Sequence, residues 1–397
     1  MSRLFTPLRL GPVEAPNRVV VAAHSTNMAD ANRVTDGHVA YYGAKARGGA
    51  GVVVLGGLRV HPTTVGGPLS ITVFDDGCVP GLARLADAVH EGGALAVGQL
   101  LHMGRQRSGG PTEWPMWAPS PLPCPVMREV PHELTVAEIG ELVGCFADAT
   151  RRCADAGLDG IELHAAHGYL PQQFLSPLTN RRTDAYGGSL DDRLRFLLEL
   201  LGACREAADG RIAVGVRISG DELVEGGLGL PEMQAVAPRL VAAGADYLSV
   251  SHCNYTGLAY AAMIPEMTTP PGAYTHLARG IREAIGQAVP VFAVGRILRP
   301  DQAEALLADG TCDAVAIVRA AIADPEWARK ARDGRAGEIR PCIGCNQGCA
   351  GMIHTGKTIR CLTNPDVGRE LEPVAPAAPR RGAWSSSARG RRASRRR

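Results

Sequence analysis

The stretch TVAEIGELVGCFADATRRCADAGLDGIELH, residues 135–164, contains one complete helix–turn–strand unit. Apolar residues recur every three or four positions over Thr135–Ala156, which predicts an amphipathic helix. The helix ends before Gly157, the residue type that helix C-termini favour. The short apolar run Gly160–His164 then predicts a buried strand that finishes on a polar residue.

The same unit recurs along the chain. The sequence predicts eight strands, at Arg18–Ala22, Gly51–Leu55, Ala94–Gln99, Gly160–His164, Ile212–Arg217, Tyr247–Ser251, Val291–Val294 and Ala314–Val318. Amphipathic helices are predicted between them, for example at Val79–His90, Ser189–Ala208, Leu230–Ala243 and Arg299–Ala308. Eight strands that alternate with helices favour an α/β fold, a (β/α)8 TIM barrel, over an open doubly wound sheet.

Length and composition fit a barrel with an appendage. The chain has 397 residues, of which 45% are hydrophobic, and a single barrel takes roughly 250 residues or more. The net charge is +2, but residues 380–397 hold eight arginines and no acid, which leaves about −6 for the rest. That body shows no basic patch for nucleic acid, and no apolar run suits a membrane span or signal peptide. We therefore expect a cytoplasmic protein.

Polar residues end several of the predicted strands. These residues are Gln99, His164, Arg217, Ser251 and the adjacent His252. Because catalytic groups of TIM barrels lie at the C-terminal ends of the strands, we expect these side chains to converge on one mouth. The segment 101–131, rich in proline and glycine, is expected to form a loop over it.

The most distinctive motif is His164-Ala-Ala-His167-Gly-Tyr169, directly after a strand. Two neutral imidazoles can polarise a carbonyl, and a tyrosine can deliver a proton to carbon. The alternative is two hydrogen-bonded loop histidines and a packing tyrosine, to which the spacing alone gives about one chance in three. A metal site is disfavoured because no third ligand follows at a suitable spacing.

Further polar groups suggest a cofactor. Arg217 at a strand end needs an anionic or polar partner, which a reduced flavin or an ordinary carboxylate would provide. The loops after the last two strands carry Gly295, Arg296 and Arg319, at the place where barrels often bind phosphate.

Four cysteines cluster near the C-terminus. Cys342, Cys345, Cys349 and Cys361 have the spacing C-x2-C-x3-C-x11-C. Four thiolates at this spacing bind structural zinc or a [4Fe–4S] cluster, and the spacing alone does not separate the two.

These motifs, with Ser176-Pro-Leu-Thr-Asn180 and Asp184-Ala-Tyr-Gly187-Gly188 downstream, resemble the Old Yellow Enzyme family, the NADH:flavin oxidoreductases. The resemblance runs from about Leu4 to Ala331 and implies bound FMN. It implies that Ala22, Ala23, His24, Gly57, Gln99 and Arg217 contact the flavin, and that Gly295, Arg296 and Arg319 hold its phosphate. His164 and His167 match the pair that anchors the substrate's activating group, and Tyr169 matches the proton donor.

The cysteine string resembles that of the multi-domain 2,4-dienoyl-CoA reductase and trimethylamine dehydrogenase branch of this family. The resemblance implies a [4Fe–4S] cluster on the four cysteines and electron flow from NAD(P)H through FAD and the cluster to FMN. That branch has a second acid, a histidine, after the sixth strand. His252 lies nearby here, although Tyr255 aligns more closely with it. The dienoyl-CoA reductases lack the histidine pair, which places a CoA-ester substrate in question.

We therefore expect three regions: a barrel at 1–335, a cluster module at 336–372 and a disordered basic tail at 373–397. No Gly-x-Gly-x-x-Gly motif for FAD or NAD(P) binding follows the cysteines. When residues 382–397 are back-translated with GC-rich codons, a shifted frame reads as an apolar strand and then that motif. The tail is thus predicted to be a frameshift remnant of a nucleotide-binding domain, which sequencing the locus would test.

The expected function is FMN-dependent reduction of an activated C=C bond in a small-molecule substrate, with electrons from NAD(P)H or a separate donor protein. The alternatives are oxidation of an amine or alcohol, and a non-catalytic electron-transfer remnant. The chain could also form a homo-oligomer, on which the sequence is silent.

Overall fold

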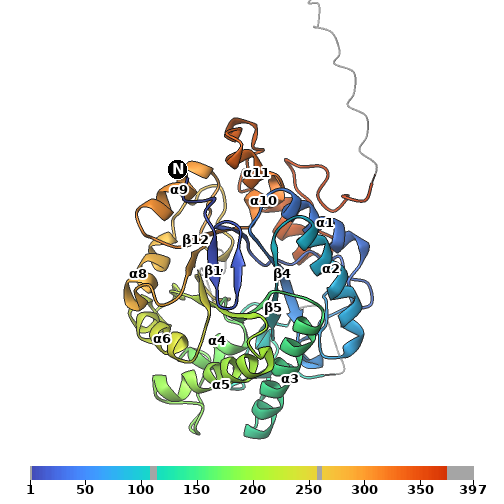
Figure 1. Cartoon of the computed structure of the whole chain (residues 1–397). Coiled ribbons are helices and arrows are strands. Elements are labelled where there is room, and N and C mark those ends of the chain that lie inside the picture. Colours follow the sequence, from blue (N-terminus) through green and yellow to red (C-terminus); the bar gives the residue numbers. More distant parts are fainter. Residues whose placement is uncertain (1, 108–113, 257–261, 373–397) are drawn as a thin grey trace, which may run out of the picture.

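Eight parallel strands close into a barrel in the computed structural model, which describes residues 2–107, 114–256 and 262–372 (Figure 1). The strands pair in chain order and the last returns to the first, which confirms the predicted (β/α)8 barrel. They are β3 (Val19–Val21), β4 (Val52–Arg59), β5 (Leu95–Leu101), β8 (Gly160–Ala165), β9 (Ala213–Ser219), β10 (Tyr247–Ser251), β11 (Val291–Ala293) and β12 (Ala314–Ile317).

Helices surround the barrel on its outside (Figure 1). The longer ones are α1 (Asp36–Arg47), α2 (Val79–Glu91), α3 (Val136–Asp155), α5 (Leu190–Ala208), α6 (Leu230–Ala242), α8 (Thr275–Ile285) and α9 (Pro300–Ala308). Short helices α4 (Leu170–Leu175), α10 (Arg319–Ala323), α11 (Trp327–Arg332) and α12 (Met352–His354) follow later strands. The α3 helix begins with a capping box in which the Thr135 hydroxyl accepts from the Glu138 N–H, and the Glu138 carboxylate accepts from the Thr135 N–H.

One end of the barrel is closed by a hairpin of β1 (Leu8–Leu10) and β2 (Val13–Ala15). Leu8, Leu10 and Ala15 belong to the same buried apolar cluster as inward-facing strand residues such as Val52 and Tyr247. Because this end is filled with apolar side chains, the polar residues that end the strands lie at the opposite face.

The β4 strand is longer than predicted. We expected it to end at Leu55, but it continues to Arg59 through an irregularity in its pairing with β5 between Leu55 and Leu58. A Cβ at Gly56 would lie 2.0 Å from the His24 carbonyl oxygen, so only glycine fits. Beyond this bulge, Leu58 and Arg59 pair with Leu100 and Leu101 of β5 and extend the strand toward the face where the polar strand ends gather.

The loop at 101–131 is not without structure: β6 (Trp117–Ala118) pairs with β7 (His132–Glu133). Residues 108–113 of this predicted substrate-facing loop lie outside the described residues. The predicted disordered tail at 373–397 also lies outside them.

The C-terminal segment, red in Figure 1, returns to the first part of the chain. The Ile359 N–H donates to the Thr26 carbonyl at 3.0 Å, and the Asn27 amide donates to the Ile353 carbonyl at 3.0 Å. Residues 26 and 27 belong to the loop between β3 and α1. The boundary that we predicted at residue 335 stays a prediction.

Candidate active site

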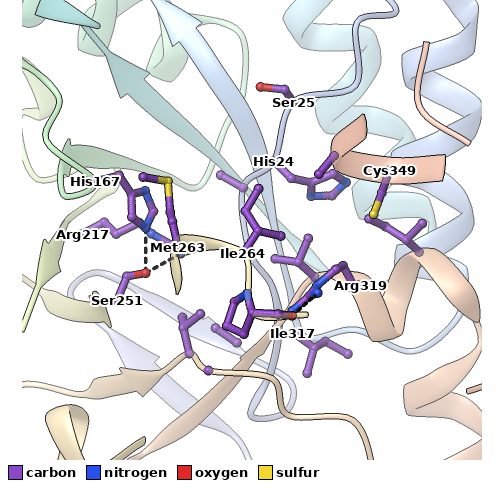
Figure 2. A pocket seen from close by; sticks show the side chains of 18 of the residues that line it. His24, Ser25, His167, Arg217, Ser251, Met263, Ile264, Ile317, Arg319 and Cys349 are labelled. Carbon is purple, nitrogen blue, oxygen red and sulfur yellow. Dashed lines mark hydrogen bonds between the residues drawn. The ribbon is translucent and has the colours of Figure 1, made fainter. Parts of the chain in front are cut away.

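A pocket lies at the C-terminal face of the barrel, opposite the hairpin. Among the predicted site residues, Ala23, His24, Gly57, Gln99, His164, His167, Tyr169, Arg217, His252, Gly295, Arg296 and Arg319 line it. Ala22 is buried just below it and bonds to the Ile317 carbonyl. Figure 2 shows His167, Arg217 and Ser251 on one side of this pocket, and Arg319 and Cys349 on the other. Residues from all eight barrel strands or the loops after them thus converge on this pocket.

His164 and His167 bond to each other. The His164 Nδ1 accepts from the Ala166 N–H at 3.3 Å, so its Nε2 carries the proton and donates to His167 Nδ1 at 3.3 Å. By the same logic His167 Nε2 donates to the Ser251 hydroxyl at 2.7 Å. Burial lowers the pKa of both imidazoles well below the ordinary value, and nearby Arg217 lowers each pKa further. Both rings are therefore neutral donors.

Tyr169 stands beside this pair. Its ring meets that of His164 edge-on with centroids 4.8 Å apart, and its hydroxyl lies 3.1 Å from the hydroxyl of Tyr255. Tyr255 lies on the loop after β10 and also lines the pocket. A phenol held next to a second phenol has a partner from which its proton can be replaced.

His252 lies on the same wall but faces other groups. Its Nε2 donates to the Ala262 carbonyl at 3.1 Å, and its ring stacks on Tyr274 with centroids 3.7 Å apart. Burial lowers its pKa to about 4, although the bond to Ala262 acts in the opposite direction. The structure thus pairs Tyr169 with Tyr255, the residue that aligned more closely with the second acid.

Arg217 is the residue that fits a flavin best. It is buried two residues before the end of β9, and its Nε and Nη1 have no hydrogen-bond partner in the described residues. Burial lowers the pKa of Arg217, and nearby Glu162 acts in the opposite direction. The two form no ion pair within 4.0 Å, and the Glu162 carboxylate accepts from Gln99 at 2.7 Å. Two free N–H groups directed at a pocket wall suit an anionic flavin edge.

The residues that were predicted to hold the phosphate of the flavin line the other side of the pocket. Gly295 has φ of +144°, and Arg296 has the left-handed φ of +57°. The Arg319 guanidinium donates to the Pro265 carbonyl at 2.5 Å and to the Asn346 side-chain oxygen at 2.7 Å. Arg319 therefore links the barrel to the C-terminal segment, while it still lines the pocket.

The four cysteines line a second, smaller cavity. Cys342, Cys345, Cys349 and Cys361 are all free thiols. Arg319 and Cys349 line this cavity and the large pocket alike. In the described part of the chain, no three or more His, Cys, Asp or Glu side chains are close enough to form a ready metal site. Four thiols are chemically suited to bind a metal centre, and the cluster itself stays a prediction.

One buried residue of this region was absent from the sequence interpretation. Arg59 ends β4 and is 8% exposed. Because the strand was predicted to stop at Leu55, Arg59 was not recognised as a strand end. The apolar residues on both sides of it, Leu58 and Val60, are the signal that the strand continues.

Comparison with known proteins decides the family. Residues 3–338 match the model of the NADH:flavin oxidoreductase / NADH oxidase family. The chain belongs to this family. A metal reductase of Desulforamulus reducens is 41% identical to this chain, over 94% of this chain and 55% of the relative. An N,N-dimethylglycine/sarcosine dehydrogenase of Chromohalobacter salexigens is 36% identical over 92% of this chain and 53% of that relative.

The structure of 2-naphthoyl-CoA reductase in complex with 2-naphthoyl-CoA superposes on the chain with a TM-score of 0.87 at 31% identity, over 94% of this chain and 58% of that one. The NADH:flavin oxidoreductase described here thus spans about half the length of these relatives. The name of the family describes oxidoreductases that act on NADH and a flavin. No helix within the described ranges combines the length and the apolar character that a membrane crossing requires.

Proposed function

We propose that the chain binds FMN and reduces an activated C=C bond, such as that of an enone, enoate or dienoyl thioester. The observation that carries the proposal is the joint placement of His164, His167 and Tyr169 in one pocket with Arg217, whose Nε and Nη1 have no hydrogen-bond partner in the described residues.

The chain's own residues would divide the work as follows. Arg217 and Gln99 would hold the flavin ring, and Gly295 and Arg296 its phosphate. FMN, when bound, supplies the hydride for the β-carbon. His164 and His167, which are neutral and protonated at one nitrogen each, would turn from their present partners to the carbonyl oxygen of the substrate. Tyr169 would protonate the α-carbon, and Tyr255 at 3.1 Å would support that transfer.

Electrons would come from NAD(P)H, as the family supports. They would arrive directly, from a separate donor protein or through an FAD-containing domain. The four cysteines would hold a [4Fe–4S] cluster, for which their chemistry and their shared cavity are the support. A cluster there would carry single electrons, and Cys349 lies where the two cavities adjoin.

Oxidation of an amine is the second candidate. The relative named as an N,N-dimethylglycine/sarcosine dehydrogenase favours it at 36% identity. The two functions differ in direction. An amine substrate bleaches oxidised flavin, whereas an enone re-oxidises reduced flavin.

The test separates the two half-reactions in the purified chain. Tyr169→Phe should slow re-oxidation of the reduced flavin by 2-cyclohexenone about 100-fold, the usual size of a general acid's contribution. Flavin reduction by NADPH or dithionite should stay within about twofold, because no proton is delivered to carbon in that step. Tyr186→Phe, at a tyrosine bonded to Glu199 outside the pocket, is the control. Equal loss of both half-reactions would refute the role of Tyr169, and bleaching by sarcosine would favour amine oxidation.

A further inference from the structure

Arg59 is a buried cation without a partner. It lies at the end of β4, is 8% exposed, and its Nε and Nη1 atoms have no hydrogen-bond partner in the described residues. Burying a guanidinium without pairing it costs several kcal/mol or more, so such groups are normally matched by an anion. The fold keeps this cation unmatched.

Other buried arginines of the described chain differ from Arg59 in this respect. Each of four has a carboxylate near enough to act on it: Arg105 with Glu222, Arg107 with Glu129, Arg182 with Asp184, and Arg217 with Glu162. Around Arg59 the groups that oppose the effect of burial on its pKa are two phenols, Tyr169 and Tyr255. Arg59 therefore lies beside the proton-donor pair, and no carboxylate among the described residues forms an ion pair with it.

The guanidinium lies next to the pocket, because Tyr169 and Tyr255, whose phenols act on it, both line the pocket. Gly57, two residues earlier, lines the pocket, and a Cβ at that position would lie 3.9 Å from Arg59 Nη1. Because position 57 is a glycine, it places no side chain of its own next to the guanidinium. Gly57 also has φ of +49°, which favours glycine there.

We propose that Arg59 binds a carboxylate of the substrate, so that the enzyme acts on small molecules that carry a carboxylate near the reacting carbon atoms. This inference rests on the proposed function and assigns its substrate class. A guanidinium forms two parallel hydrogen bonds with a carboxylate, which a neutral ester or amide cannot match. The negative charge would also compensate the buried cation that the protein leaves unmatched.

The experiment compares an acid with its ester on the FMN-loaded chain. The probes are trans-4-oxo-2-pentenoate and its methyl ester, which share one enone and differ in charge. The wild type should prefer the acid in kcat/KM, and Arg59→Met should lower kcat/KM for the acid about 10- to 100-fold, the usual worth of a hydrogen bond to a charged group. The ester should change less than about threefold. Arg59→Lys should restore part of the preference for the acid, because lysine keeps the positive charge but lacks the paired N–H donors of the guanidinium.

Arg107→Met is the matched control. Arg107 is also buried near this face, but its guanidinium donates to the Thr63 carbonyl at 3.1 Å and to the Trp114 carbonyl, so it has partners already. Its loss should change acid and ester alike. If Arg59→Met fails to fold, the test is whether the wild type prefers the acid and whether that preference is reduced in Arg59→Lys.

Three results would overturn the inference. They are a wild type that prefers the ester, equal losses for both probes in Arg59→Met, and loss of FMN from that variant, which would assign Arg59 to the cofactor. Binding of the two probes to oxidised enzyme, followed by the change in the flavin spectrum, gives a readout without turnover. If neither probe re-oxidises the flavin yet the acid binds more tightly through Arg59, the proposed reaction fails and the carboxylate site stands.

Discussion

His167 has the left-handed φ of +59°, which is uncommon for a residue with a side chain. Its N–H donates to the Ser219 hydroxyl at 3.0 Å and its Nε2 to Ser251, so two strands hold this conformation in place. Strained backbone of this kind persists where surrounding contacts over-determine it, which is common at active sites. The glycine that follows, Gly168, also has positive φ and completes the turn toward Tyr169.

The buried histidines predict a pH dependence of stability. Burial lowers the pKa of His252 from 6.5 to about 4. Between these values the unfolded chain binds a proton at this site that the folded chain does not, so the free energy of unfolding falls as the pH falls from about 6.5 to 4. The slope from one such group is at most about 1.4 kcal/mol per pH unit.

Urea unfolding over this pH range measures the effect. His252→Gln should reduce the slope of the free energy of unfolding against pH by up to about 1.4 kcal/mol per pH unit, which is the contribution of one proton. At pH 7 to 8 the variant and the wild type should show parallel pH dependence. An unchanged slope in the acid range would mean that His252 titrates normally in the folded chain.

For single residues, the sequence predicted which side chains form the site better than it predicted which of them bond to each other. His164, His167 and Tyr169 were predictable because they follow a strand within six residues and must share its end. The bond of Tyr169 to Tyr255 and the position of Arg59 depend on how β10 and β4 continue beyond their regular parts. Neither a loop path nor a bulge has a periodic signature.

Among elements, the strands were predictable because β-branched runs bounded by glycine recur with helical spacing between them. The α1 helix was not among the helices that we predicted. It buries His38, Tyr41, Tyr42 and Lys45, so its inner face is largely polar or amphipathic by composition. The Lys45 ammonium lies 3.0 Å from the centre of the Tyr41 ring, and this cation–π contact replaces the usual apolar stripe.

The β9 strand predicts a sharp steric effect. A Cβ at Gly215 would lie 2.0 Å from Tyr247 Cζ, inside the barrel, where the Tyr247 ring stacks on Phe292. Gly215→Ala should therefore lower the free energy of unfolding by about 1–3 kcal/mol or more, because the packed interior has no room to move.

Gly202→Ala is the matched control. Gly202 lies in α5 with no atom within 4 Å of an added Cβ. Alanine there should stabilise the chain by about 0.5–1 kcal/mol through helix propensity. Denaturant midpoints measure both variants, and a neutral Gly215→Ala would contradict the packing described for this strand.

For the whole molecule, the metal content is the decisive measurement. Anaerobically purified chain should contain roughly four irons and four acid-labile sulfides, with flavin absorbance over a broad shoulder. Cys345→Ser should lower the iron content and leave the flavin in place, because Cys345 lines only the smaller cavity. Zinc in place of iron would assign the four cysteines to a structural site, and absence of both metals would refute a metal centre.

Cys349 and Arg319 face two cavities at once, one between the strand ends and one among the cysteines. If a flavin and a metal centre fill these cavities, any factor by which one changes the affinity of the other applies equally in the opposite direction. Removal of the metal centre would then change the dissociation constant of the flavin by the same factor as removal of the flavin changes that of the metal centre.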